Sequence, residues 1–153
     1  MTGFGASAGW VMPAELEMLR DTVRRFIASE VAPAEAKLAD GQARLDQAVL
    51  AALQTKARDL GLWAMATPER FGGAGMGVLA QVVVAEEAAK CRLGAFFPAA
   101  GAIGGDPPSV LFKGSAEQFE RYGRPIIEGR MPKAFTAISE ASGGSDPARA
   151  IQC

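Results

Sequence analysis

Residues 134–148, AFTAISEASGGSDPA, are the part of this sequence best suited to chemistry, because a short extended segment runs into a glycine turn. Residues 134–138 are apolar apart from Thr136 and suit a pleated surface, so we predict a β-strand there. The turn consists of Ser142, Gly143, Gly144, Ser145 and Asp146. Its glycines permit positive φ angles that expose adjacent backbone N–H groups, and the Ser139 and Ser145 hydroxyls add donors. Such a turn can hold a phosphate, although most Gly/Ser turns beside Asp-Pro are plain surface loops.

Other kinds of chemistry are restricted by the residues present. The sequence has no histidine, which removes the commonest general base and the commonest transition-metal ligand, so we expect no metal site. Cys91 and Cys153 make no disulfide framework, and we expect Cys91 to be a small buried apolar residue. Glu86 and Glu87 are adjacent on a predicted helix, where neighbours point a quarter turn or more apart. They cannot face one substrate as an acid and base, so we expect them at the surface or at a helix end and assign no catalytic residue.

The elements that must position the turn are helical. From residue 13 onward, apolar residues recur at three- and four-residue spacing, with charged residues on the other face. We predict helices at 13–32, 34–39, 45–60, 78–92, 108–112 and 115–128. The helix at 78–92 is apolar nearly all round at its start, so we expect it at the centre of the bundle. The predicted fold class is all-α, a helical bundle with a short extended segment at the C-terminus.

Local signals set the ends of these helices. Pro33 is expected to break the first helix, and Pro125 to bend the last one. Gly61 and Gly129 suit left-handed positions just after helices. Ser115 is expected to open the last helix through a capping box with Gln118.

Two segments between the predicted helices could in principle bind a ligand. The glycine-rich PERFGGAGMG at 68–77 lacks the preceding strand and the G-x-G-x-x-G spacing of a dinucleotide-binding fingerprint, so we reject that assignment. The broken apolar segment 94–114 could shape a substrate cavity, but ordinary packing is the commoner role of such residues. Trp63 and Met65 are likewise expected in the core.

The composition excludes several classes of partner. The chain has 153 residues, enough for one good core, and its 16 basic and 17 acidic residues are interspersed, giving a net charge of −1. This charge provides no patch for nucleic acid or an anionic membrane, and we expect neither partner. No apolar run approaches bilayer-spanning length, and MTGFGASAGW lacks the pattern of a secretory signal. We therefore expect a cytoplasmic protein.

Three motifs occur together in one order: PERFGGAGMG at 68–77, GSAEQFERYGRPIIEGR at 114–130 and AFTAISEASGGSDPA at 134–148. Through them the sequence resembles the acyl-CoA dehydrogenase family of flavoproteins, whose last motif has the pattern A-x-T-E-P-x-A-G-S-D. The resemblance covers about residues 13–150. It implies a helical N-terminal domain at 13–132 and the truncated start of a flavin-binding β domain at 133–153. Residues 1–12 contain three glycines and no periodicity, so we expect a flexible lead there.

The resemblance also implies a cofactor, a substrate and binding residues. The cofactor would be FAD and the substrate an acyl-CoA thioester, which loses an α proton to a glutamate and a β hydride to the flavin. Thr136, Ile138 and Ser139 would line the isoalloxazine ring, with the Ser139 hydroxyl in place of the usual threonine near N5. Gly144 and Ser145 would contact the flavin diphosphate and the neighbouring CoA. A homo-oligomer is expected, and the motif at 68–77 is implied to connect helices without a catalytic role.

The sequence departs from the family pattern in ways that matter for activity. Ala141 stands where proline is usual and Ser142 where a small residue, often glycine, is usual, which we expect to loosen the turn. The family's catalytic glutamate belongs to a C-terminal helical bundle that this sequence does not match, so no residue here takes that role. We therefore expect the 153 residues alone to be inactive, and interpret the ending ARAIQC as a truncation.

Two other functions stay open at this point. A same-superfamily acyl-CoA oxidase or flavin-dependent hydroxylase would have similar residues here, because oxygen reactivity and substrate choice depend largely on parts of the family that this chain does not match. A helical interaction module without chemistry is the alternative from another class. In that case the apolar surface meant for missing domains would drive self-association.

Overall fold

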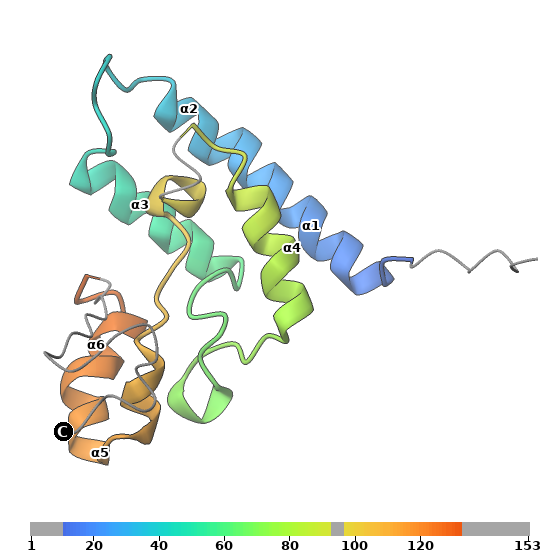
Figure 1. Cartoon of the computed structure of the whole chain (residues 1–153). Helices are drawn as coiled ribbons and strands as arrows, with labels where there is room; N and C mark the ends of the chain where they lie inside the picture. The colour runs from blue at the N-terminus through green and yellow to red at the C-terminus, as the bar shows by residue number, and fades with distance from the viewer. Residues whose placement is uncertain (1–10, 93–96, 133–153) are drawn as a thin grey trace, which may run out of the picture.

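The structure is a computed structural model in which residues 11–92 and 97–132 are described (Figure 1). These residues confirm the predicted all-α fold: they form helices and contain no β-strand, and their β pairing is an isolated bridge between Trp63 and Gly104. The predicted strand at 134–138 and the domain boundary near Lys133 lie outside the described residues. The described residues lie almost entirely within the predicted helical domain at 13–132.

The helices follow one another in short pieces. The α-helices are α1 (Ala14–Phe26), α2 (Ala32–Glu35), α3 (Gln47–Asp59), α4 (Val78–Ala88), α5 (Ala116–Gln118) and α6 (Arg124–Ile127). Between them lie the π-turns η1 (Ile27–Val31) and η5 (Phe119–Gly123) and the 3₁₀ turns η2 (Glu69–Phe71), η3 (Pro98–Gly101) and η4 (Ser109–Lys113). In Figure 1, α1 and α4 run side by side, α3 lies across from them, and α5 and α6 form a smaller unit below α3.

The prediction that Pro33 breaks the first helix is wrong. The helix continues from α1 through η1 into α2, and the N–H of Ala32 donates to the carbonyl of Ile27, five residues back. A proline lacks the N–H for an i−4 bond and its ring clashes with that carbonyl. Widening one turn to i−5 bonds just before Pro33 removes both problems, so the chain keeps its direction.

A π-turn also precedes Pro125. In η5 the N–H of Arg124 donates to the carbonyl of Phe119, again five residues back, and α6 starts with Pro125 in its first turn. The predicted capping box is confirmed: the N–H of Gln118 donates to Ser115 Oγ at 3.2 Å, and the N–H of Ser115 donates to Gln118 Oε1 at 2.8 Å. One continuous helical path therefore runs from Ser115 to Ile127.

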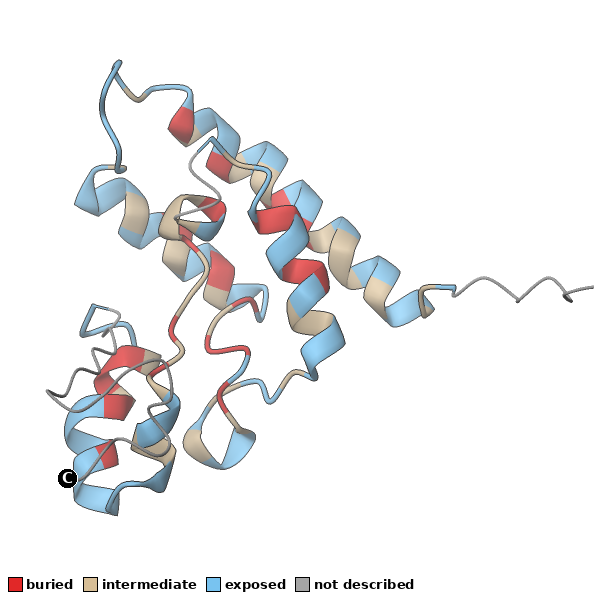
Figure 2. Cartoon of the chain, in the orientation of Figure 1, coloured by how far each residue is buried: buried red, intermediate tan, exposed pale blue. Residues whose placement is uncertain are grey.

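The core lies where α1, α3 and α4 meet the segment around η3 (Figure 2). Its fully or almost fully buried apolar residues include Val23, Phe26, Val31, Leu53, Ala57, Leu62, Val84, Ala99 and Ala102. The predicted stripe of the first helix therefore faces this core. Along the predicted helix at 45–60, Leu53 and Ala57 are buried and Leu45 packs against the core, whereas Val49 and Leu60 are exposed.

The expectation that α4 starts at the centre of the bundle is wrong within the described residues. Val78 is 77% exposed, Leu79 46% and Val82 54%, whereas the opposite side of α4, with Val83 and Val84, is buried. Helix α4 therefore covers α1 with one face and leaves an apolar face open, which we call the α4 face and define as Val78, Leu79 and Val82.

Candidate functional site

The predicted flavin-contacting residues, Thr136, Ile138, Ser139, Gly144 and Ser145, lie outside the described residues. The structure therefore neither brings them together nor separates them, and their roles stay predictions. The structure does describe the last helix, α6, and the turn that follows it, a few residues before Thr136 in the sequence. This turn and the side chains that contact it are the described features nearest in sequence to the predicted flavin-contacting residues.

The last helical turn is closed by backbone hydrogen bonds. The N–H groups of Arg130 and Met131 both donate to the carbonyl of Pro125, at 2.8 and 3.0 Å. Gly129, just before these two residues, has φ +69°, as predicted for a left-handed residue after a helix. This reversal ends α6 and sets the backbone direction at residues 130–131.

Two side chains from earlier in the chain pack against this turn at residues 129–131, which we call the exit turn. Trp63 Nε1 donates to the carbonyl of Ile127 at 2.6 Å, and the Arg58 guanidinium lies over the Trp63 ring, 4.4 Å from its centroid. A Cβ at Gly129 would overlap the Arg58 guanidinium, and a Cβ at Gly105 would overlap the Trp63 indole. Trp63 was expected in the core with Met65; Met65 is in the core, but Trp63 is half-buried at this junction.

The glycine-rich loop after Trp63 is tightly packed on itself. The Asp106 Oδ1 accepts from both the N–H and the hydroxyl of the buried Thr67, at 2.8 and 2.7 Å. A Cβ at Gly73 would overlap the Thr67 carbonyl and lie 2.7 Å from the Ala64 carbonyl, so only glycine fits there. Residues 68–77 therefore connect α3 to α4 through a compact, tightly packed turn.

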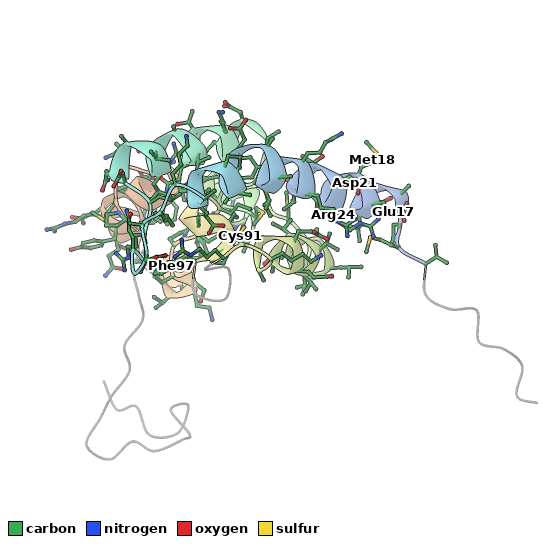
Figure 3. All side chains as sticks on the ribbon, turned by 90° about the horizontal axis from the view of Figure 1, so that it is seen from above. Glu17, Met18, Asp21, Arg24, Cys91 and Phe97 are labelled. Atoms are coloured by element: carbon green, nitrogen blue, oxygen red, sulfur yellow. The ribbon has the colours of Figure 1, made fainter. Side chains whose placement is uncertain are left out.

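The expectation that Glu87 lies at the surface is wrong, while Glu86 is exposed as expected. Glu87 is 3% exposed, and its Oε1 lies 2.9 Å from both Arg24 Nη2 and Lys90 Nζ. Arg24 reaches it because α1 and α4 pack side by side; Figure 3 shows Arg24 on the side of α1 turned toward α4. The hydrogen bond from Arg24, followed by that from Lys90, outweighs burial and lowers the pKa of Glu87. Glu87 is thus a structural carboxylate that is charged at neutral pH, where it holds α1 and α4 together.

Cys91 is half-buried beside the core (Figure 3). Burial, together with the nearby Glu35 carboxylate, raises its pKa to about 11. A thiol with so high a pKa is not a nucleophile at neutral pH. Cys91 therefore behaves as the small apolar residue that we predicted, although it is only partly covered.

Most of the segment considered for a substrate cavity packs as ordinary structure. The Phe112 ring lies 4.9 Å from Phe71 and 6.1 Å from Phe119, measured between centroids, and Ile103 packs against the main core. Val110 is 65% exposed, and Phe96 lies outside the described residues.

A cavity of about 340 Å³ lies elsewhere, as an open groove between α1 and α3. Charged residues of both signs line it, and two of them, Lys56 and Glu30, pair with each other at 2.5 Å. The groove therefore offers no unbalanced charge to attract a ligand.

Among residues 11–92 and 97–132, no three acidic, cysteine or histidine side chains gather as they would around a metal ion. No helix in this part of the chain is long and apolar enough to cross a membrane.

Comparison with known proteins gives one consistent result. The family model described as "Acyl-CoA dehydrogenase, N-terminal domain" matches residues 13–130. The chain is 32% identical over 143 residues to (R)-benzylsuccinyl-CoA dehydrogenase of Thauera aromatica, covering 86% of this chain and 35% of that protein. It is 34% identical over 134 residues to cyclohexane-1-carbonyl-CoA dehydrogenase of Geobacter metallireducens, covering 86% and 33% of the two chains.

A mammalian relative agrees with the bacterial ones. The mitochondrial short-chain specific acyl-CoA dehydrogenase of Sus scrofa is 32% identical over 137 residues, covering 88% of this chain and 31% of that protein. No solved structure matches the chain significantly. The chain spans about a third of the length of the curated relatives it matches. Because the family model covers most of the sequence and agrees with the helical fold, the chain belongs to the acyl-CoA dehydrogenase family, of which it carries the N-terminal domain.

Proposed function

We propose that this chain is the N-terminal part of an FAD-dependent acyl-CoA dehydrogenase, acting on an acyl-CoA thioester. The observation that carries the proposal is the family match at residues 13–130, followed within four residues by the serine and glycine segment at 134–148. The segment's position after the helical domain is the one that the family resemblance requires. Its flavin role rests on that resemblance and on its donor groups.

The donor groups of the segment suit a flavin and its diphosphate. The Ser139 hydroxyl would donate to the ring near N5, with Thr136 and Ile138 beside the ring. The backbone N–H of Gly144 and the Ser145 hydroxyl would donate to the diphosphate, because convergent neutral donors stabilise an anion. Bound FAD supplies the hydride acceptor of the reaction; these residues supply position.

We propose in addition that the 153 residues alone do not dehydrogenate an acyl-CoA. The relatives are about three times as long, and no residue here matches the family's catalytic glutamate. FAD binding by the chain alone is expected to be weak or absent for the same reason. A homo-oligomeric state and a cytoplasmic location are also predictions, as is the choice of a dehydrogenase over the related oxidase or hydroxylase.

A chimera tests this proposal. The matched N-terminal third of the Geobacter metallireducens relative is replaced by residues 1–153 of this chain, and the purified protein is examined for the visible absorption spectrum of bound flavin. We expect a yellow protein with FAD near one per subunit. A chimera made in the same way with the Sus scrofa N-terminal third is the matched control. If the control binds FAD and a folded chimera with this chain does not, the proposed function is wrong.

One observation favours the interaction module as a second function of the chain alone. The α4 face leaves Val78, Leu79 and Val82 largely exposed next to one another on the helix. Together they offer roughly 300 Å² of apolar surface, below the ~800 Å² per partner of a stable interface, so self-association would be weak. Sedimentation velocity from about 10 to 500 μM checks this. A single monomeric species over the whole range would exclude the module.

A further inference from the structure

We propose that Trp63 and Arg58 are positioning residues for the flavin-contacting turn, because they fix the point and direction at which the chain leaves the helical domain. The inference rests on the proposed function for the flavin, and on the contacts of the described residues for everything else. Neither residue belongs to the segment that would touch FAD.

The first step is that three separate segments meet at Trp63. The indole N–H donates to the carbonyl of Ile127 at 2.6 Å, a carbonyl in the last turn of α6 that has no intrahelical partner to accept from. The indole also fills the space that a side chain at Gly105 would need, and the next residue, Ala64, donates to the carbonyl of Gly104 at 2.7 Å. Trp63 thus joins the loop after α3 to both α6 and the strand-like segment around Gly104.

The second step is that stacking and packing, rather than an ion pair with a described residue, keep Arg58 in place. Its guanidinium stacks on the Trp63 ring at 4.4 Å and lies against the backbone of Gly129. Its buried Nε has no hydrogen-bond partner among the described residues, and none of their carboxylates forms an ion pair with it. A guanidinium kept in this place contributes packing and stacking against the exit turn.

The third step is chain connectivity. Thr136 is the seventh residue after Gly129, so their Cα atoms are at most about 25 Å apart. Displacements of ~1 Å at a reacting group can cost about a hundredfold in rate, so residues that hold the exit turn can affect a cofactor contacted this soon after it in the sequence.

The test uses Trp63→Phe, which keeps a ring but loses the N–H, and Arg58→Met, which keeps an unbranched side chain but loses the guanidinium. The matched controls are Trp10→Phe, the same change at the other tryptophan, and Arg70→Met, which removes the stack of Arg70 on Phe71 at 4.9 Å. All four variants are made in the 153-residue chain and in the chimera.

The first measurement is native-state hydrogen exchange of the 153-residue chain. We expect both test variants to speed exchange of the Arg130 and Met131 amides about five- to tenfold, as for the loss of one hydrogen bond or stack, with the Val23 amide unchanged. The controls should leave all three amides unchanged. Unchanged exchange at Arg130 and Met131, or an equal acceleration at Val23, would overturn the claim that these residues hold the exit.

The second measurement is the FAD dissociation constant of the chimera and the position of its flavin absorption band. We expect Trp63→Phe and Arg58→Met to weaken FAD binding at least tenfold and to shift the band, while Arg70→Met changes neither. If amide exchange becomes faster but FAD binding does not change, Trp63 and Arg58 only stabilise the exit turn, and the claim that they position the flavin-contacting turn is wrong. If the unsubstituted chimera binds no FAD, the proposed function fails with the flavin half of this inference, and the exchange measurement still decides the other half.

Discussion

The substitution Glu87→Gln removes one buried negative charge while keeping the size of the side chain. In the folded protein Glu87 Oε1 lies 2.9 Å from Arg24 Nη2 and 2.9 Å from Lys90 Nζ, and the side chain is 3% exposed. Arg24 is on α1 and the other two residues are on or just after α4. The substitution therefore weakens the polar connection between the two helices that form one side of the core.

The size of the effect follows from the burial of the three groups. A hydrogen bond to a charged group contributes about 1.5–3 kcal/mol when it is buried. Here the carboxylate is buried, but the two cations are about half-exposed, at 49% and 51%, so water screens them. We therefore expect Glu87→Gln to lower the free energy of unfolding by about 2 kcal/mol. For a domain of this size that corresponds to a drop in Tm of roughly 8 °C.

The loss of stability in Glu87→Gln must also depend on pH, and it must become smaller as the pH falls. The hydrogen bonds from Arg24 and Lys90 lower the pKa of Glu87 below its ordinary value of 4.5. A carboxyl whose folded pKa is depressed stabilises the protein above the unfolded pKa and loses that contribution as the pH falls through the folded pKa. The stability difference between the unsubstituted chain and Glu87→Gln should be constant above about pH 6 and shrink below pH 4.5.

Urea unfolding followed by circular dichroism at pH 3 to 8 measures both quantities. Glu86→Gln is the matched control, because Glu86 is the exposed neighbour and lies 3.7 Å from Lys90 Nζ. It should change the free energy of unfolding by less than about 0.5 kcal/mol. Equal effects of the two substitutions, or a Glu87 effect that grows as the pH falls, would refute the described arrangement of α1 and α4.

Three further predictions concern single sites. Ala100 lies in the left-handed region, with φ 56° and ψ 20°, so Ala100→Gly should raise the free energy of unfolding by about 1 kcal/mol in the same urea assay. Gly73→Ala should lower it by about 3 kcal/mol, because the new Cβ would meet two backbone carbonyls, whereas Gly77→Ala, with nothing within 4 Å of its Cβ, should have little effect. With a pKa of about 11 in place of 9.0, Cys91 should react with iodoacetamide about a hundredfold more slowly at pH 8 in the folded chain than in urea, as followed by peptide mass spectrometry.

The helical fold was predictable from the sequence because its apolar residues repeat with the helical period. The stripe through Val23 and Phe26, the left-handed cap at Gly129 and the box of Ser115 with Gln118 each depend on neighbours a few residues apart. Such local patterns are visible in one sequence without knowledge of the tertiary structure.

Features that depend on distant contacts were not predictable in the same way. Pro33 looked like a helix break, since nothing local shows that a π-turn will accommodate it. The open α4 face looked like a core helix, because apolar composition does not reveal whether a partner is present. For Glu87 a local signal did exist: it follows the buried Val83 and Val84 at four- and three-residue spacing, which places it on the buried side of α4.

In the candidate site, too, the residues that belong to a local pattern were predictable and those that act through distant contacts were not. The residues predicted to touch FAD come from one continuous segment, so the resemblance could name Thr136, Ser139 and Ser145 from the sequence alone. Trp63 and Arg58 lie some seventy residues earlier and meet the end of α6 only through the tertiary fold. If the exit turn sets where that segment begins, part of the flavin geometry is determined by residues outside the segment predicted to contact the flavin. A search restricted to the binding motif would therefore overlook them.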